Sequence, residues 1–168
     1  MFTGILTESV NKTRNHVFWP SRQVIDSTMP SIFSERYPKC RAIIDCTEIK
    51  VQRAANVDQK IYCYSQYKSN FTAKFLIAIA PNGFISFVSR CHGGRGSDTY
   101  ITNDSGLLEL LEPNDQLLAD TGFPRIKCKD NVVLVMPPFL HEGHLSAEEV
   151  DETYNIASLR VHVERLVQ

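Results

Sequence analysis

The sequence predicts an α/β domain, in which helices flank a mixed β-sheet. Short apolar runs of strand length recur along the chain, and two of them are joined by the hairpin turn Pro81-Asn82-Gly83. Segments with apolar residues at helical spacing follow these runs. The chain has 168 residues and is 43% hydrophobic, which is enough for one domain with a buried core.

Two short helices are expected ahead of the first strand. Ser21 can cap a helix over residues 22–28, which Pro30 ends, and a second helical turn covers residues 31–36. Residues 1–20 are polar and irregular. We interpret them either as an amino-terminal arm or as the remnant of a leading segment.

The first strand is expected over about residues 41–45, and residues 49–51 are expected either to prolong it or to follow it. Its centre, Ala42-Ile43-Ile44, is apolar at every position, as in a strand buried on both faces, and the run ends at Asp45. A carboxylate at the end of such a strand lies at the rim of the sheet, where active sites of α/β proteins are found. We expect residues 53–60 to form a polar loop, and residues 62–68, with aromatics at alternate positions, to form a strand or an extended arm.

The predicted hairpin joins strands at residues 75–80 and 84–89. The glycine-rich residues 92–98 then predict an exposed turn, whose final Ser or Asp caps the next helix. Four leucines between residues 99 and 111 suit a helix that packs on a sheet. The glycine-rich turn matches neither of the glycine motifs that bind nucleotides, so a loop with a cap is the simpler interpretation.

A second short apolar run, at residues 116–120, again ends in Asp, here Asp120. Residues 132–136 are typical of another buried strand. Ser146 and Glu149 form a capping box for an amphipathic helix that runs to the end of the chain.

Three carboxylates in these elements predict a metal site. Asp45 and Asp120 each end a strand, so they converge if the two strands are neighbours, and the last helix can supply Glu164. Three close carboxylates repel one another unless a cation neutralises them, and Mg²⁺ and Mn²⁺ prefer oxygen ligands. Two such ions, ~4 Å apart, can activate a water or a 3′-hydroxyl in phosphodiester transfer. Taken singly, each Asp is also typical of a turn, and Glu164 of a helix-surface ion pair with Arg160.

Other features give weaker signals. His141 and His144 are three residues apart, which does not match the HExxH zinc motif. The five cysteines form no CxxC pair, and reduced intracellular thiols are the natural interpretation. Residues 1–90 hold 12 Lys and Arg against 6 Asp and Glu, whereas residues 91–168 hold 6 against 13. The basic half suits a polyanion and the acidic half suits metal cations, and no apolar run is long enough to cross a membrane.

Several motifs occur together and in a fixed order, and their combination is specific. They are IIDCTEI, YSQYKSNFTAKFLIAIAPNGFISFVS, GSD at 96–98, LLADTGF at 117–123, VVLVMPPF at 132–139 and IASLRVHVER at 156–165. Over roughly residues 19–168 the chain resembles the DDE superfamily endonuclease domain of PIF/Harbinger-type transposases and of their transposase-derived relatives.

The resemblance implies an RNase H-like fold and metal-dependent cutting and joining of DNA in the nucleus. The family's first Asp falls on Asp45 in IIDCTE, its second on Asp120 in ADTGF, and its final acidic residue on Glu164 in HVER. It also implies a separate DNA-binding partner protein or a DNA-recognition domain elsewhere. Because relatives continue further with a basic helical segment, we expect the endonuclease domain, residues 21–168, to be shortened at its carboxyl end.

Five further residues are candidates for secondary roles. Glu48 and Asp98 can interact with the metal ligands without binding the metal themselves. Lys68, Lys74 and Arg95 can contact DNA phosphates. A surface position is the alternative for Glu48 and for the basic residues.

We therefore predict a DNA endonuclease in which Asp45, Asp120 and Glu164 hold two Mg²⁺ or Mn²⁺ ions. The main alternative is a domesticated, catalytically inactive interaction protein that keeps the transposase fold and binds a DNA-binding partner. A third interpretation is a metal-free hydrolase that uses two carboxylates as acid and base.

Overall fold

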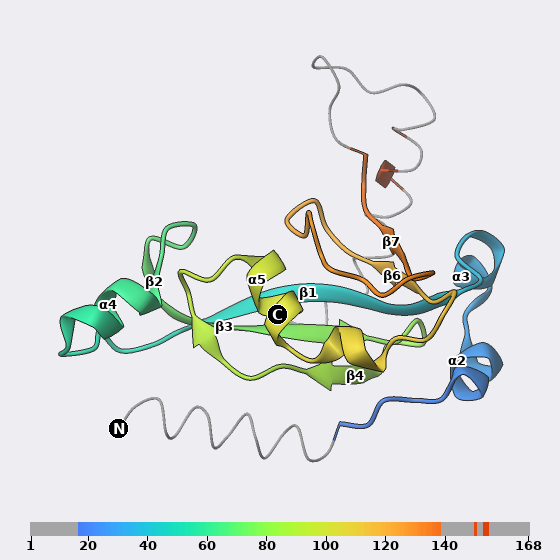
Figure 1. The fold of residues 1–168 in the computed structure, drawn as a ribbon, viewed down its shortest axis with the longest axis horizontal. Helices are drawn as coiled ribbons and strands as arrows, with labels where there is room; N and C mark the ends of the chain where they lie inside the picture. Colours follow the sequence, from blue (N-terminus) through green and yellow to red (C-terminus); the bar gives the residue numbers. More distant parts are fainter. Residues whose placement is uncertain (1–16, 139–149, 151–152, 155–168) are drawn as a thin grey trace.

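The computed structural model describes residues 17–138, 150, 153 and 154 of the chain. These residues form a mixed sheet with short helices on both of its faces (Figure 1). The strands are β1 (Cys40–Lys50), β2 (Tyr64–Ser65), β3 (Asn70–Ile79), β4 (Ile85–Val88), β5 (His92–Gly93), β6 (Gln116–Leu118) and β7 (Val133–Val135). The helices are α2 (Arg22–Thr28), α3 (Ser31–Arg36), α4 (Val57–Cys63), α5 (Asp98–Asp104) and the 3₁₀ helix η1 (Leu107–Leu110). None of the helices in this part of the chain has the length and apolar character that crossing a membrane requires.

The sheet combines an antiparallel half with a parallel half around β1. On one side, β1 pairs antiparallel with β3, and β3 pairs with β4 in the hairpin. On the other side, β6 lies parallel to β1, and β7 lies parallel to β6. Helices α5 and η1 connect the antiparallel half to β6 (Figure 1). This mixed sheet flanked by helices confirms the predicted α/β, RNase H-like fold class.

Both faces of β1 are buried near its start. Ala42 and Ile44 pack on one face with Ile101 of α5 and with η1. Ile43 packs on the other face with Phe33 of α3. Because successive side chains of a strand point to opposite faces, a run that is apolar at every position fits a strand covered on both sides.

β1 is longer than the sequence predicts. It pairs with β3 from Ile43, opposite Ile79, to Lys50, opposite Thr72. The prediction that the strand ends at Asp45 is therefore wrong, because five more residues continue it. Pairing with β3 satisfies the backbone hydrogen-bonding groups of these largely polar residues. A search for apolar runs does not identify such a segment as a strand.

The segment after β1 also differs from the prediction. Where a polar loop and an extended arm were expected, Asn56 Oδ1 accepts hydrogen bonds from the amides of Asp58 at 2.8 Å and Gln59 at 3.4 Å and starts α4. Only β2 is extended there. α4 buries none of its residues, so it lacks the apolar face by which a helix is recognised in sequence.

The hairpin lies where its turn sequence predicts it, and Gly83 supplies a φ of 91° there. Ser97 caps α5, as predicted, by accepting a hydrogen bond from the amide of Tyr100 at 3.2 Å. The helix expected over residues 99–111 is split into α5 and η1, because Gly106 takes the left-handed conformation with a φ of 82°.

The two helices ahead of β1 lie as predicted. Ser21 caps α2, Ile25 of α2 is buried, and Phe33 of α3 packs against the sheet. Arg22 of α2 also reaches Asp115, with 3.1 Å between Nη1 and Oδ1. This ion pair joins α2 to the turn that precedes β6.

Candidate active site

Asp45 lies in β1, and Asp120 follows the neighbouring parallel strand β6. β1 and β6 pair with Ile43 opposite Leu118, and Ala119 still donates a backbone hydrogen bond to β7. Asp45 lies two residues past Ile43 within β1, and Asp120 lies two residues past Leu118, just beyond the end of β6. Because side chains alternate along β1, the Asp45 carboxylate lies on the face that Ile43 occupies.

A local hydrogen bond orients each of the two aspartates. Asp45 is half-buried, and its Oδ1 accepts a bond from the amide of Cys46 at 2.9 Å. Asp120 is also half-buried, and its Oδ1 accepts bonds from both the amide and the hydroxyl of Thr121, the latter at 2.9 Å. One oxygen of each carboxylate is therefore fixed relative to the backbone of the residue that follows it.

The third predicted ligand, Glu164, lies outside the described residues, and of the helix expected from Ser146 the structure describes only residues 150, 153 and 154. Within the described residues, no group of three or more His, Cys, Asp or Glu side chains could hold a metal ion. The two aspartates nevertheless suit Mg²⁺ or Mn²⁺, because neighbouring carboxylates offer hard oxygen ligands and their like charges favour a cation between them.

Glu48 lies on the opposite face of β1 from Asp45. It is three residues further along the strand, so alternation turns its side chain toward α5. There Glu48 Oε2 accepts a hydrogen bond from Thr72 Oγ1 at 2.7 Å. Lys74 Nζ lies 3.5 Å from Glu48 Oε1 and 2.6 Å from Asp98 Oδ1. Glu48 therefore faces away from Asp45, in contrast to the supporting position predicted for it.

The cluster of Glu48, Lys74 and Asp98 is an ion network enclosed by the protein. Burial raises the pKa of Glu48, but hydrogen bonds from Thr72 and Ser65 and the charge of Lys74 outweigh it and hold this pKa below its ordinary value of 4.5. Burial likewise lowers the pKa of Lys74, and the bond and charge of Asp98 outweigh that effect and raise it. The Lys74 side chain is 12% exposed. An ammonium so placed is not available to a DNA phosphate, contrary to the predicted contact.

Asp98 also approaches the turn that follows Asp120. A Cβ added at Gly122 would lie 3.0 Å from Asp98 Oδ2, so the glycine leaves room for this carboxylate. On its other side Asp98 bonds to the thiol of Cys46, whose pKa burial raises, with a further increase from the Asp98 charge. That thiol stays protonated and is no nucleophile. The Gly-Ser-Asp turn therefore links α5 to β1 and to the turn after Asp120.

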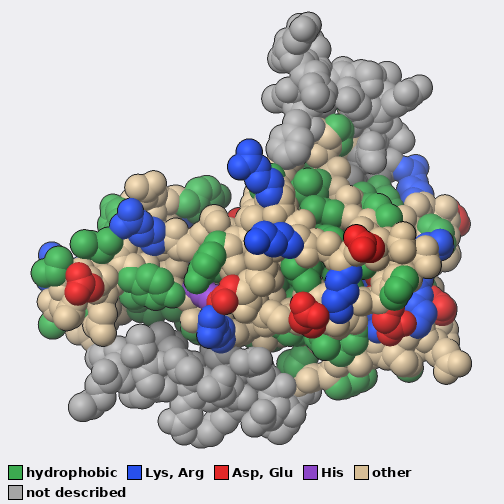
Figure 2. Space-filling view, viewed as in Figure 1, with side chains coloured by type: hydrophobic (Ala, Val, Ile, Leu, Met, Phe, Trp, Pro, Cys, Tyr) green, Lys and Arg blue, Asp and Glu red, His purple; other side chains and the backbone are tan. Residues whose placement is uncertain are grey.

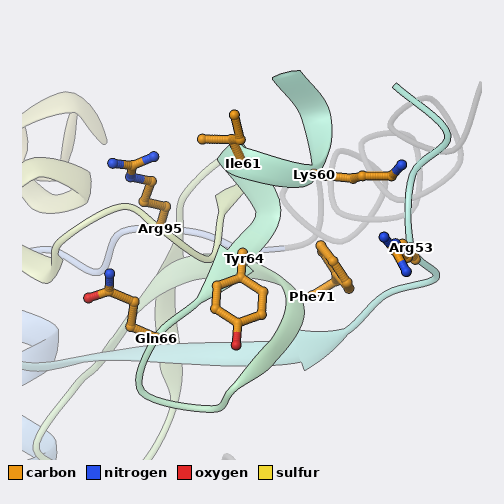
Figure 3. A pocket seen from close by; sticks show the side chains of 7 residues that line it. All are labelled: Arg53, Lys60, Ile61, Tyr64, Gln66, Phe71 and Arg95. Carbon is orange, nitrogen blue, oxygen red and sulfur yellow. The ribbon is translucent and has the colours of Figure 1, made fainter. Parts of the chain in front are cut away.

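The remaining basic candidates, Lys68 and Arg95, lie at the end of the sheet where α4 and β2 are found. Lys68 is exposed, with its Nζ 4.9 Å from the centroid of the Tyr67 ring. Arg95 lines an open pocket of about 360 Å³ (Figure 3). Figure 2 shows hydrophobic side chains gathered around this end of the molecule.

Sequence reasoning missed two other basic residues of this pocket, Arg53 and Lys60. The available signal was basic residues interleaved with aromatic ones over residues 53–71. The pattern is hard to use because polarity alone predicts a loop and an extended arm there, whereas the segment forms α4 and β2.

Comparison with known proteins gives one match. A family model described as DDE superfamily endonuclease matches residues 44–168, which is more than half of the chain. The matched region contains Asp45, Asp120 and Glu164. Searches of the curated proteins and of the solved structures gave no match.

Proposed function

We propose, from the premise that the chain belongs to the DDE superfamily endonuclease family, that it is a metal-dependent nuclease that cleaves DNA phosphodiester bonds. Within the superfamily we assign it to the PIF/Harbinger-type transposases and their transposase-derived relatives, on the motifs that carry that resemblance. Residues 21–168 would be the endonuclease domain. DNA would be its substrate and the nucleus its location.

The observation that supports this function best is the register of β1 and β6. It pairs Ile43 with Leu118, two residues before Asp45 and Asp120, although 74 residues separate the two aspartates in sequence. Continued past Leu118, the same register would set the two carboxylates side by side. Parallel neighbours with carboxylates at matching positions are a geometry that ordinary turn formation does not require. Glu164 would complete the set from the segment that follows β7.

In the proposed mechanism the protein positions the reacting groups. Asp45, Asp120 and Glu164 would hold two Mg²⁺ or Mn²⁺ ions, with the amide of Cys46 and the hydroxyl of Thr121 fixing one oxygen of each aspartate. Such ions, when bound, supply Lewis acidity to the scissile phosphate and lower the pKa of an attacking water or 3′-hydroxyl. Water would give strand cleavage, and a 3′-hydroxyl would give strand joining.

Recognition of a particular DNA sequence would come from another protein or domain. Several of the cations that the structure describes are engaged with carboxylates, among them Arg22 with Asp115, Lys74 with Asp98 and Arg90 with Asp104. We therefore propose that a DNA-binding partner or a separate DNA-recognition domain brings this chain to its target.

Nicking of supercoiled plasmid DNA tests the proposed function. With Mn²⁺ or Mg²⁺ the 168-residue chain should convert supercoiled to open-circular DNA, and EDTA should stop the reaction. Asp45→Asn and Asp120→Asn should each lower the rate at least about 100-fold, because each removes a ligand charge at the reacting centre. Glu164→Gln should do the same.

Asp130→Asn is the matched control, because it removes an exposed carboxylate in the turn before β7. It should nick DNA at the wild-type rate. Nicking that persists in Asp45→Asn would contradict the assigned site. A folded wild-type chain without activity in either metal would favour the catalytically inactive interaction protein instead.

A further inference from the structure

The pocket that Arg95 lines is built from three segments at the end of the sheet (Figure 3). β2 and β3 supply its aromatic floor, where Tyr64 lies opposite Phe71 and the two rings meet edge to face with centroids 5.5 Å apart. α4 supplies Lys60 from one side. Arg53, from the segment between β1 and α4, lies with its guanidinium carbon 5.8 Å from the centroid of the Phe71 ring.

Arg95 is held at the pocket by two glycines of the turn before it. The amide of Gly94 donates to the carbonyl of Thr72 at 2.9 Å, and the amide of Arg95 donates to the carbonyl of Tyr62 at 3.3 Å. A Cβ at Gly93 would fall 2.2 Å from the Tyr62 carbonyl oxygen, and one at Gly94 would fall 1.9 Å from Thr72 Oγ1. Only glycine permits this close approach, which sets the position of the Arg95 side chain.

The lining of the pocket combines positive charge with exposed aromatic surface. Arg53, Lys60 and Arg95 contribute cations, and none of the lining residues is acidic. The ring of Tyr64 is accessible, since the residue is 41% exposed. Cations beside accessible aromatic rings match the chemistry of an unstacked nucleotide, whose base stacks on a ring and whose phosphates attract guanidinium and ammonium groups.

We propose that this pocket binds an unpaired nucleotide of the DNA substrate, with its base on Tyr64 and Phe71 and its phosphates at the three cations. This inference rests on the proposed function for the identity of the nucleic acid. It adds a second DNA-binding site, separate from the carboxylates that would carry out cleavage.

The position of the pocket relative to Asp45 follows from the register of β1 and β3. Asp45 lies opposite Ile77, and Phe71 is six residues from Ile77 along β3. An even separation keeps Phe71 on the sheet face that Asp45 occupies. Six residues of strand span about 20 Å, so the pocket lies about that far along the sheet from Asp45.

Fluorescence anisotropy with two labelled probes tests the proposal. One probe is a short oligo(dT) strand, and the other is an abasic strand of equal length, which keeps every phosphate and lacks the bases. In EDTA the wild-type chain should bind oligo(dT) at least about 5-fold more tightly than the abasic strand. Phe71→Leu should abolish this preference and leave abasic binding unchanged, whereas Arg95→Gln should weaken the binding of both probes.

Two further variants make the result independent of effects on folding. Tyr64→Leu removes the more accessible ring and should also lower the preference for oligo(dT). Phe84→Leu is the matched control, because Phe84 is 72% exposed beside the hairpin turn and away from the pocket, and it should bind both probes as the wild type does.

Equal wild-type affinity for the two probes would overturn the proposal, because it would show attraction to a polyanion without contact to bases. Base preference that survives in both Phe71→Leu and Tyr64→Leu would overturn it as well. Binding in EDTA does not depend on cleavage. A chain that nicks DNA without preferring bases contradicts this inference alone, and one that prefers bases without nicking DNA contradicts the proposed function alone.

Discussion

Asp45 and Glu48 lie three residues apart in β1, with their side chains on opposite faces of the strand. Each belongs with a second acidic residue, and the two groups differ in their surroundings. On the α5 face, Lys74 bridges Glu48 and Asp98, and the three groups form a network within the protein. On the other face of β1 lies Asp45, and Asp120, which we propose as its neighbour in the metal site, follows the adjacent parallel strand β6.

The difference indicates separate roles for the two pairs. A buried carboxylate pair that is bridged by an ammonium group holds strands and a helix together. Its oxygens are then not available to bind a ligand from solution. Two like charges placed together cost folding free energy, and natural proteins carry such costs where function needs them. We therefore assign stability to the network of Glu48, Lys74 and Asp98, and metal binding to Asp45 and Asp120.

The largest effect on stability is expected for Lys74→Met. It leaves two carboxylates without their bridging cation, in a place where the Glu48 side chain is only 6% exposed. We expect the free energy of unfolding to fall by about 3 kcal/mol, as measured by urea denaturation. Lys68→Met, at an exposed neighbouring site, should change it by less than about 0.5 kcal/mol. A loss of similar size in both variants would argue against the bridging role.

A smaller effect is expected from the pH dependence that Glu48 confers. Its pKa in the folded protein lies below the ordinary value of 4.5, so its stabilising contribution is complete above that pH and is lost as the pH falls through the folded-state pKa. Glu48→Gln should lower stability at neutral pH by about 1–2 kcal/mol. It should also flatten the loss of stability below about pH 4.5 in urea titrations at several pH values. If Glu48→Gln lost stability below about pH 4.5 as steeply as the wild type, groups other than Glu48 would be responsible for that loss.

The smallest effect, and one of opposite sign, is expected for Asp120→Asn. Asn retains the oxygen that accepts the bonds from Thr121 and removes one of two neighbouring like charges. In metal-free buffer the variant should be as stable as the wild type or more stable by up to about 1 kcal/mol. In Mn²⁺ the wild type alone should gain thermal stability, because the metal binds the folded state. A clear destabilisation without metal would place Asp120 with the structural carboxylates.

The parts of the fold that depend on local sequence could be predicted. The hairpin follows from Pro81-Asn82-Gly83, and α5 begins where Ser97 can cap it. The full length of β1 could not be predicted, because its second half is held by pairing with β3. The helix α4 could not be predicted either, because it has an asparagine cap but no apolar face. In each of these cases the deciding contact comes from tertiary structure or from one polar side chain, neither of which periodicity reveals.

The candidate site divides in the same way. The sequence marks Asp45 and Asp120 as carboxylates at or near strand ends, but whether they can meet depends on β1 and β6 being parallel neighbours, which only the fold decides. Glu48 is close to Asp45 in sequence but not in space, because two strand residues that are three positions apart have their side chains on opposite faces. Glu164 stays a prediction from the sequence.

Isothermal titration of Mn²⁺ into the metal-free chain tests most directly whether Asp45 and Asp120 share one metal site. The wild type should show saturable binding, and Asp130→Asn should match it. Asp45→Asn and Asp120→Asn should each lose that binding while circular dichroism shows that they remain folded. A folded wild type that binds no Mn²⁺, or binding that survives in either of these two variants, would contradict the shared site.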